Sequence, residues 1–292
     1  MTAQPLLSVV VCTHQRVRHL VTCLAALAAL EDTVEVIVVD SASSPPVADA
    51  AEGFRDHLPQ LMYVYEEEPG LSVARNTGLR VATCDLVAFV DDDAAPEPAW
   101  ARRIVSGFKG AEVACVGGSC TAVFEAPRPR WMSDRLLELA GISNFGGSSR
   151  LVTRSADYPF GANIAFRKDA LAAIGGFDPA LGRTRSSLLS GEESAAIRRL
   201  LSRGYQVRLE PSAVVRHTVT TERLQRGYYR RRFYWQGVTR ARMGSRVRRA
   251  GGLLLEIPGY LAAWLRTRDR YFLYRAGAET VGHLAEWAGR AR

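Results

Sequence analysis

Three consecutive carboxylates, Asp91-Asp92-Asp93 (the acidic triplet), directly follow the apolar run Leu86–Val90. Like charges at this spacing repel one another unless a cation or several hydrogen-bond donors relieve the repulsion. Carboxylate oxygens are hard ligands of the kind that Mg²⁺ or Mn²⁺ prefers, often together with the oxygens of a diphosphate. A helix N-terminus could also attract an acidic residue here, but capping uses only one carboxylate. The triplet therefore favours a divalent metal site.

A second acidic pair, Glu192-Glu193, follows Gly191 at the start of a segment with helical spacing. A carboxylate in this position, beside a polar loop, is well placed to accept a proton from an incoming hydroxyl. The same pair would suit the positive end of a helix dipole without any chemistry, so both interpretations stay open. His217 follows a short apolar run and could ligate a metal or orient a phosphate, although a lone histidine more often has no such role.

Polar residues also follow the first two apolar runs of the chain. Thr13 and Arg16 come after Leu7–Cys12, and Asp40 comes after Val34–Val39. In an open parallel sheet, ligands bind at the carboxyl ends of the strands, where loops and helix N-termini converge. We therefore expect these side chains to lie near the acidic triplet.

Two further segments combine glycines with a polar side chain. Arg75 lies within Gly70–Gly78 and could meet a phosphate or an acidic residue such as Asp91, although a solvated helix face is the preferred explanation when the residue is taken alone. Asn163 ends the small-residue turn Gly161-Ala-Asn. A ligand could approach the backbone closely at such a turn, and a plain tight turn also accounts for the glycine.

The first 120 residues alternate between short apolar runs rich in β-branched residues and segments with helical spacing. Such alternation predicts βαβ units and a mainly parallel sheet with helices on both faces. We expect strands at residues 7–12, 34–39, 61–65 and 86–90, and helices at 17–30 and 71–81. Residues 121–160 predict a long connection rich in Pro, Gly and Ser. Further on we expect helices at 168–174 and 192–203, strands at 206–209 and 214–217, and then a helical, Arg-rich tail.

The composition, with 47% hydrophobic and 23% charged residues, is typical of a folded globular protein and excludes general disorder. The five cysteines are an odd number without a CxxC pair, and several lie in apolar runs. This pattern favours reduced core thiols over disulfides or a zinc site, so we expect a cytoplasmic protein. The first residues do not resemble a secretion signal, and no apolar run is long enough to predict a membrane-spanning helix.

Positive charge is concentrated near the C-terminal end. From Arg216 onward there are 17 arginines, no lysine and five acidic residues, although the whole chain carries only +8. Such a tail suits an anionic partner, for example a lipid surface, nucleic acid or a phosphorylated acceptor, or else a solvated helix face. No nucleic-acid-binding motif accompanies the charge, so we expect no nucleic acid partner.

The tail also carries apolar residues. The segment Tyr228–Trp235 mixes aromatic and basic side chains, and Leu253, Ile257, Leu261 and Trp264 recur at helical spacing. This apolar stripe could pack on the catalytic part of the chain or on a second subunit, while the arginines could contact the surface of a membrane.

Taken together and in order, these residues resemble the family 2 glycosyltransferases, which have the GT-A fold. Each motif alone is weak, but their order and spacing agree over residues 8 to 193, about two thirds of the chain. The matching segments are Val9–Arg16, Val38–Ser43, Gly70–Gly78, Asp91–Asp93, Gly161–Asn163, Gly175–Asp178 and Gly191–Glu193.

The resemblance implies an α/β, GT-A-like nucleotide-diphospho-sugar transferase fold with a helical C-terminal extension. It implies an inverting, hexosyltransferase-type enzyme that moves a sugar from a nucleotide-diphosphate donor to an acceptor hydroxyl on a glycan, a lipid-linked molecule or a small molecule. One catalytic domain would then span residues 1–220, with a nucleotide-binding half at 1–120 and an acceptor half at 121–220. Residues 221–292 would form the Arg-rich extension, which fits peripheral contact with the inner face of a membrane.

The resemblance also assigns roles to single residues. Thr13, Arg16 and Asp40 would hold the base and ribose, and Arg75 would support the base or diphosphate. Asp91 and Asp92 would belong to the donor site, with Asp92 facing the ribose or sugar. Asp93 would bind Mn²⁺ or Mg²⁺, helped by His217, and Asn163 would line the acceptor side of the donor sugar. Glu193 stands where the family usually has aspartate, so it would be the catalytic base; its longer arm leaves the choice between Glu193 and Glu192 open.

Two other functions compete with this one. A nucleotidyltransferase also joins an α/β sheet to carboxylates and metal, but it would normally have a Gly-rich phosphate loop near the first strand, and Thr13–Arg16 contains no glycine. A non-catalytic module that binds sugar or lipid would leave both the acidic triplet and the Glu192-Glu193 pair without a role.

Overall fold

The computed structural model describes residues 4–244 and 250–289, and the chain forms two compact units. The first, here called the sheet unit, comprises Met1–Val123, Gly141–Pro179 and Glu192–Thr218. The second, the helical unit, comprises Phe124–Ala140, Ala180–Gly191 and Val219–Arg292. The sequence suggested a single boundary at residue 220. In the structure, two segments from the expected catalytic domain, 124–140 and 180–191, cluster instead with the C-terminal residues.

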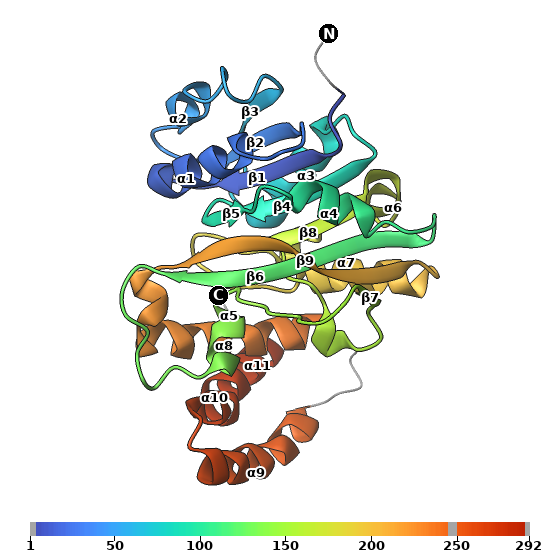
Figure 1. The fold of residues 1–292 in the computed structure, drawn as a ribbon. Coiled ribbons are helices and arrows are strands. Elements are labelled where there is room, and N and C mark those ends of the chain that lie inside the picture. The colour runs from blue at the N-terminus through green and yellow to red at the C-terminus, as the bar shows by residue number, and fades with distance from the viewer. Residues whose placement is uncertain (1–3, 245–249, 290–292) are drawn as a thin grey trace. The chain divides into compact units, whose positions relative to one another are not determined.

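A nine-stranded mixed sheet forms the centre of the sheet unit, in the order β3-β2-β1-β4-β8-β6-β9-β5, with β7 beside β9 (Figure 1). Its parallel part consists of β1 (Ser8–Thr13), β2 (Glu35–Ser41), β3 (Leu61–Glu66) and β4 (Leu86–Asp91). In this register Thr13 pairs with Asp40, and Cys12 pairs with Asp91. The expected parallel strands are thus confirmed, and the polar residues at their carboxyl ends meet at one edge of the sheet.

The other part of the sheet is antiparallel. It contains β5 (Ala94–Pro96), β6 (Val113–Phe124), β7 (Arg150–Leu151), β8 (Asn163–Arg167) and β9 (Gln206–Val219). The sequence did not predict β6, because Gly117-Gly118 interrupts its apolar run. Glycine is needed at position 118 because the backbones of β6 and β9 approach closely there. A Cβ at Gly118 would lie 2.0 Å from the carbonyl oxygen of Ala213. The two strands expected at 206–209 and 214–217 are one continuous strand.

Helices cover both faces of the sheet, as the alternating pattern predicted. On one face, Val9 and Val11 of β1 belong to a core cluster shared with α1 (Val17–Ala28), α2 (Ala48–Glu52) and α4 (Trp100–Ser106). On the other face, Val10 belongs to a cluster shared with α3 (Leu71–Val81), α6 (Lys168–Ala173) and α7 (Glu192–Ser202). Single 3₁₀ turns lie at Ser155–Asp157 and Pro179–Leu181.

The helical unit contains α5 (Asp134–Leu139), a 3₁₀ turn at Thr221–Leu224, α8 (Arg226–Met243), α9 (Ala250–Thr267), α10 (Arg270–Tyr274), a π-helical turn at Arg275–Glu279 and α11 (Thr280–Trp287). Helices α8 and α11 cross closely, because a Cβ at Gly237 would lie 1.9 Å from the carbonyl oxygen of Glu279. Within the described residues, no helix is both long and apolar enough to cross a membrane.

The contact between α3 and β1 gives a test of this packing. A Cβ at Gly78 would lie 2.3 Å from Cγ1 of the buried Val10. We expect Gly78→Ala to lower the free energy of unfolding by about 1–3 kcal/mol, because overpacking outweighs the roughly 1 kcal/mol that alanine gains in helix propensity. Urea unfolding measures the change.

Gly53→Ala is the matched control, because a Cβ there would meet no atom closer than 3.7 Å. Combining Gly78→Ala with Val10→Ala should cost less stability than the sum of the two single changes, because the smaller side chain makes room for the new Cβ. If Gly78→Ala is as stable as the unchanged chain, α3 does not pack on β1 at this distance.

Candidate functional site

The acidic triplet lies where β4 ends, and its carboxylates are largely removed from water. Asp92 and Asp93 are buried, and Asp91 is partly exposed. Burial raises the pKa of Asp92 to about 7, although the guanidinium of Arg16 acts in the opposite direction. Negative charge concentrated in this way requires nearby cations or hydrogen-bond donors.

Two residues at the end of β1 supply donors to the triplet. Arg16 donates from Nη1 to Asp92 Oδ1 at 2.6 Å and from Nη2 to Asp93 Oδ2 at 2.8 Å. Thr13 Oγ1 donates to Asp92 Oδ2 at 2.8 Å. The structure thus brings both residues to the triplet, as expected, where they hold its carboxylates. Their contact with a nucleotide stays a prediction.

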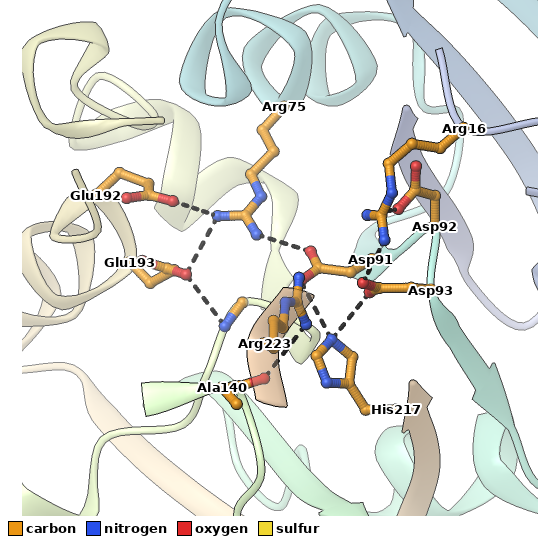
Figure 2. Close-up of polar contacts among 11 residues, drawn as sticks. Arg16, Arg75, Asp91, Asp92, Asp93, Ala140, Glu192, Glu193, His217 and Arg223 are labelled. Atoms are coloured by element: carbon orange, nitrogen blue, oxygen red, sulfur yellow. Dashed lines mark hydrogen bonds and ion pairs between the residues drawn. The ribbon is translucent and has the colours of Figure 1, made fainter. Parts of the chain in front are cut away.

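His217 completes a group that could hold a metal ion. It lies on β9, and its Nε2 is 2.9 Å from Asp93 Oδ1 and 3.9 Å from Asp91 Oδ2. One ligand atom from each of Asp91, Asp93 and His217 lies within 4.8 Å of the other two. Figure 2 shows the imidazole directed at the two carboxylates. These residues fit a divalent metal ion, since two carboxylates and an imidazole meet at one place.

The burial of His217 supports this interpretation. Its side chain is buried, and neither ring nitrogen has a hydrogen bond of ordinary geometry to any described residue. Buried polar atoms are rarely left in this state, and a metal ion bound by the imidazole would give one of these nitrogens a partner. A glycine makes room for the ring, because a Cβ at Gly141 would lie 2.8 Å from His217 Cε1.

Arg75 connects the triplet to the second acidic pair. From α3, its Nη2 lies 3.3 Å from Asp91 Oδ1, and its Nη1 lies 2.9 Å from Glu192 Oε1 and 3.4 Å from Glu193 Oε1 (Figure 2). The guanidinium is buried and stands over the ring of Phe177. Burial alone would lower the pKa of Arg75, but the three carboxylates raise it overall. Arg75 is therefore a permanent buried cation between two acidic groups.

Asn76, which follows Arg75 in the sequence, fixes the loop that contains Phe177. Asn76 Nδ2 donates to the carbonyl oxygen of Phe177 at 2.8 Å, and its Oδ1 accepts from the amide of Phe177 at 2.8 Å. The turn that contains Gly175, Gly176 and Phe177 is thus held beside Arg75.

The two glutamates have different surroundings. The side chain of Glu192 is 1% exposed, whereas that of Glu193 is 17% exposed. Glu193 Oε1 also accepts a hydrogen bond from the backbone amide of Gly161 at 3.2 Å. A Cβ at Gly161 would lie 2.3 Å from both Arg75 Nη2 and Glu193 Oε1. Sequence reasoning considered Gly161 only as a turn or ligand contact, and it missed this donor because the partner is 32 residues away.

Asp40 is buried and already has three donors. Its Oδ1 accepts from the amide of Ser43 at 3.1 Å, and its Oδ2 accepts from the amide of Val47 at 2.9 Å and from the hydroxyl of Tyr63 at 2.7 Å. In this structure Asp40 therefore shapes the loop that follows β2. Direct contact with a base or ribose was expected from the sequence and stays a prediction.

Asn163 is also buried and uses its whole amide inside the sheet unit. Its Nδ2 donates to the carbonyl oxygens of Ser119 and Ala213, both at 2.9 Å, and its Oδ1 accepts from Trp100 Nε1 at 2.8 Å. Both amide hydrogens are used, so neither is available to a donor sugar in this conformation. The residue braces three segments around β8.

Comparison with known proteins places these residues in context. The family model described as Glycosyl transferase family 2 matches residues 8–175, more than half of the chain. A glucosyl-dolichyl phosphate glucuronosyltransferase from Haloferax volcanii is 26% identical over 238 residues, which are 80% of this chain and 75% of that protein. A pre-mycofactocin glycosyltransferase from Mycobacterium tuberculosis is 30% identical over 85% of this chain, which spans 49% of that relative.

Two solved structures are similar to this chain in fold. The mannosyltransferase PcManGT from Pyrobaculum calidifontis, in complex with GDP-Man and Mn²⁺, matches with a TM-score of 0.65 at 20% identity, over 99% of this chain and 89% of that one. S. aureus TarS in complex with UDP-GlcNAc matches with a TM-score of 0.58 at 14% identity, over 97% and 92%. At these identities the likeness establishes the fold, which is the GT-A fold expected from the sequence.

The metal group can be tested directly. We expect His217→Ala to weaken Mn²⁺ binding at least about tenfold, because even an outer partner of a metal site is typically worth that much. Calorimetric titration with Mn²⁺ measures the change. His57→Ala removes an exposed histidine of the same unit and should bind Mn²⁺ like the unchanged chain. Unchanged Mn²⁺ affinity in His217→Ala would exclude this residue from the site.

Proposed function

The chain belongs to glycosyl transferase family 2, and on that premise we propose that it moves a sugar from a nucleotide-diphosphate donor to an acceptor hydroxyl by a metal-assisted, inverting reaction. One observation carries the proposal: Arg75 links the metal-type group of Asp91, Asp93 and His217 to Glu193. The family match argues against the nucleotidyltransferase hypothesis. The hypothesis of a non-catalytic module does not explain why Arg75 links two acidic groups.

The donor side uses the residues at the end of β4. Asp91, Asp93 and His217 would hold Mn²⁺ or Mg²⁺, which when bound neutralises charge that develops on the departing diphosphate. Arg16 is partly exposed, so it can exchange its contact with the triplet for one with a phosphate or ribose oxygen. Thr13 keeps Asp92 oriented while Arg16 moves. Asp40 and Asn163 would act indirectly, by fixing the loop after β2 and the turn before β8.

The acceptor side depends on Glu193. It is the more exposed of the two glutamates, and the amide of Gly161 and the guanidinium of Arg75 fix its carboxylate. Glu193 would take the proton of the acceptor hydroxyl while that oxygen attacks the anomeric carbon from the face opposite the diphosphate. One displacement of this kind inverts the anomeric configuration. Glu192 is too buried to meet an acceptor, and it would instead hold Arg75 in place.

We also propose that the acceptor hydroxyl belongs to a lipid-linked molecule and that the enzyme acts at the inner face of a membrane. The Haloferax relative is named for a dolichyl phosphate compound. The surplus of arginine after residue 215 supports the same location, because anionic lipids attract basic segments.

Donor binding can be tested by thermal unfolding with UDP, GDP and dTDP, each with and without Mn²⁺. One nucleotide, present at about 100 times its dissociation constant, should add roughly 2.7 kcal/mol to the free energy of unfolding. We expect this stabilisation to require Mn²⁺ and to disappear in Asp93→Asn. The absence of a shift with any nucleotide would instead support the non-catalytic module.

The base is tested by Glu193→Gln. This change removes the proton acceptor but keeps the size of the side chain, so we expect kcat to fall by about 10²–10⁴-fold while donor affinity is kept. Glu192→Gln is the matched neighbour and should lower kcat less. Steady-state kinetics with sugar donors that carry the nucleotide found by thermal unfolding separates kcat from KM. Full activity of Glu193→Gln would move the base role to Glu192 or to another residue.

A further inference from the structure

Helix α9 of the helical unit turns its polar side inward. Glu256 accepts hydrogen bonds from the hydroxyl of Tyr260 and from Arg240 Nη2 at 3.5 Å. Arg275 stands 4.6 Å from the centre of the Tyr260 ring and pairs with Glu279 at 2.9 Å. A network of charged and aromatic side chains therefore fixes this face of α9 to the rest of the helical unit.

The opposite side of α9 is apolar and exposed. Leu261 is 41% exposed and Leu265 is 58% exposed, and Pro258 and Ala262 are exposed beside them. Positions 258, 261, 262 and 265 share one helix face. A helix that packs on a globular core normally buries its apolar stripe, so α9 has the reverse orientation. The structure corrects part of the expected stripe: Leu261 points outward, while Leu253 lies among side chains that the structure does not describe.

Three arginines follow the apolar face at the end of the helix. Arg266 and Arg268 are exposed and Arg270 is partly exposed, and none of them pairs with a described carboxylate. The acidic residue between them, Asp269, is already engaged by Ser133 and by the amide of Tyr271. Arg268 lies over the ring of Trp264, at 5.3 Å from its centre.

We infer that the outward face of α9 docks on an anionic lipid bilayer, with Leu261 and Leu265 entering the boundary between headgroups and acyl chains and Arg266, Arg268 and Arg270 meeting lipid phosphates. Charge complementarity favours this partner over a second copy of the chain. Residues 257–268 contain no carboxylate, so the same stretch of another copy offers the arginines no counterion. A bilayer that contains acidic lipids supplies both an apolar layer and negative charge.

This inference rests on the proposed lipid-linked acceptor and gives it a physical basis. An interfacial helix holds a protein at the plane where the headgroup of a lipid-linked acceptor is found. Arginine side chains can extend from an apolar face toward phosphates, which suits their position at the end of α9. The contact requires no helix that spans the bilayer.

Sedimentation with vesicles tests the surface. The full chain should bind vesicles made of equal parts phosphatidylcholine and phosphatidylglycerol more tightly than vesicles of phosphatidylcholine alone. The double variant Leu261→Asp, Leu265→Asp should bind the mixed vesicles at least about tenfold more weakly, because it loses its apolar contact. Val281→Asp is the matched control, since Val281 on α11 is 57% exposed, and it should bind normally.

A second pair of variants tests the charges. Arg266→Gln with Arg268→Gln should lose roughly tenfold in affinity at low salt and should lose the preference for phosphatidylglycerol. Arg154→Gln with Arg198→Gln removes two exposed arginines of the sheet unit and is the matched control.

Three results would overturn the inference: normal vesicle binding by the leucine variant, equal loss in the Val281 control, or a dimer in solution that the leucine variant dissociates. Each variant is also tested for nucleotide-dependent stabilisation with Mn²⁺. A variant that loses vesicle binding but is still stabilised by nucleotide and Mn²⁺ supports the membrane surface. If nucleotide and Mn²⁺ stabilise no form of the chain while vesicle binding is normal, the proposed transferase site is wrong and the membrane surface is unaffected.

Discussion

Buried negative charge at the end of β4 is the constraint on which the site depends. Three adjacent carboxylates, two of them buried, need cations, and the βα connections on both faces of the sheet provide them. Arg16 precedes α1, which covers one face, and Arg75 belongs to α3, which covers the other. Both guanidinium groups reach the same sheet edge because parallel strands place their carboxyl ends together. The charge arrangement thus depends on the βαβ connections.

The two glutamates show how local packing separates two chemically equal groups. Glu192 and Glu193 are adjacent on α7, and both lie near the guanidinium of Arg75. Complete burial restricts Glu192 to holding Arg75, whereas partial exposure leaves Glu193 able to meet an incoming molecule. Sequence alone could not choose between them, because adjacent helical residues differ by only about 100° around the helix axis, and tertiary packing decides which side chain is buried.

Features that follow from local pattern were predictable from sequence, and features that depend on distant partners were not. The alternation of β-branched runs and helical spacing predicted the parallel strands, and it also predicted that Thr13, Asp40 and the acidic triplet would gather at one edge. The roles of Asp40 and Asn163 depend on Tyr63 and Trp100, which no spacing rule connects to them. Segments 124–140 and 180–191 joined the helical unit for the same reason, since their contacts lie far away in the sequence.

The position of Arg75 between Asp91 and the two glutamates couples the two acidic groups electrostatically. On the proposed function, a divalent ion held by Asp91, Asp93 and His217 would share Asp91 with Arg75 and would weaken the pairing of Asp91 with the guanidinium. The charge of Arg75 would then act mainly on Glu192 and Glu193. A carboxylate beside a stronger positive charge is held more firmly in its ionised form. Occupation of the metal group would thus be felt at Glu193 through Arg75, because this one guanidinium contacts both acidic groups.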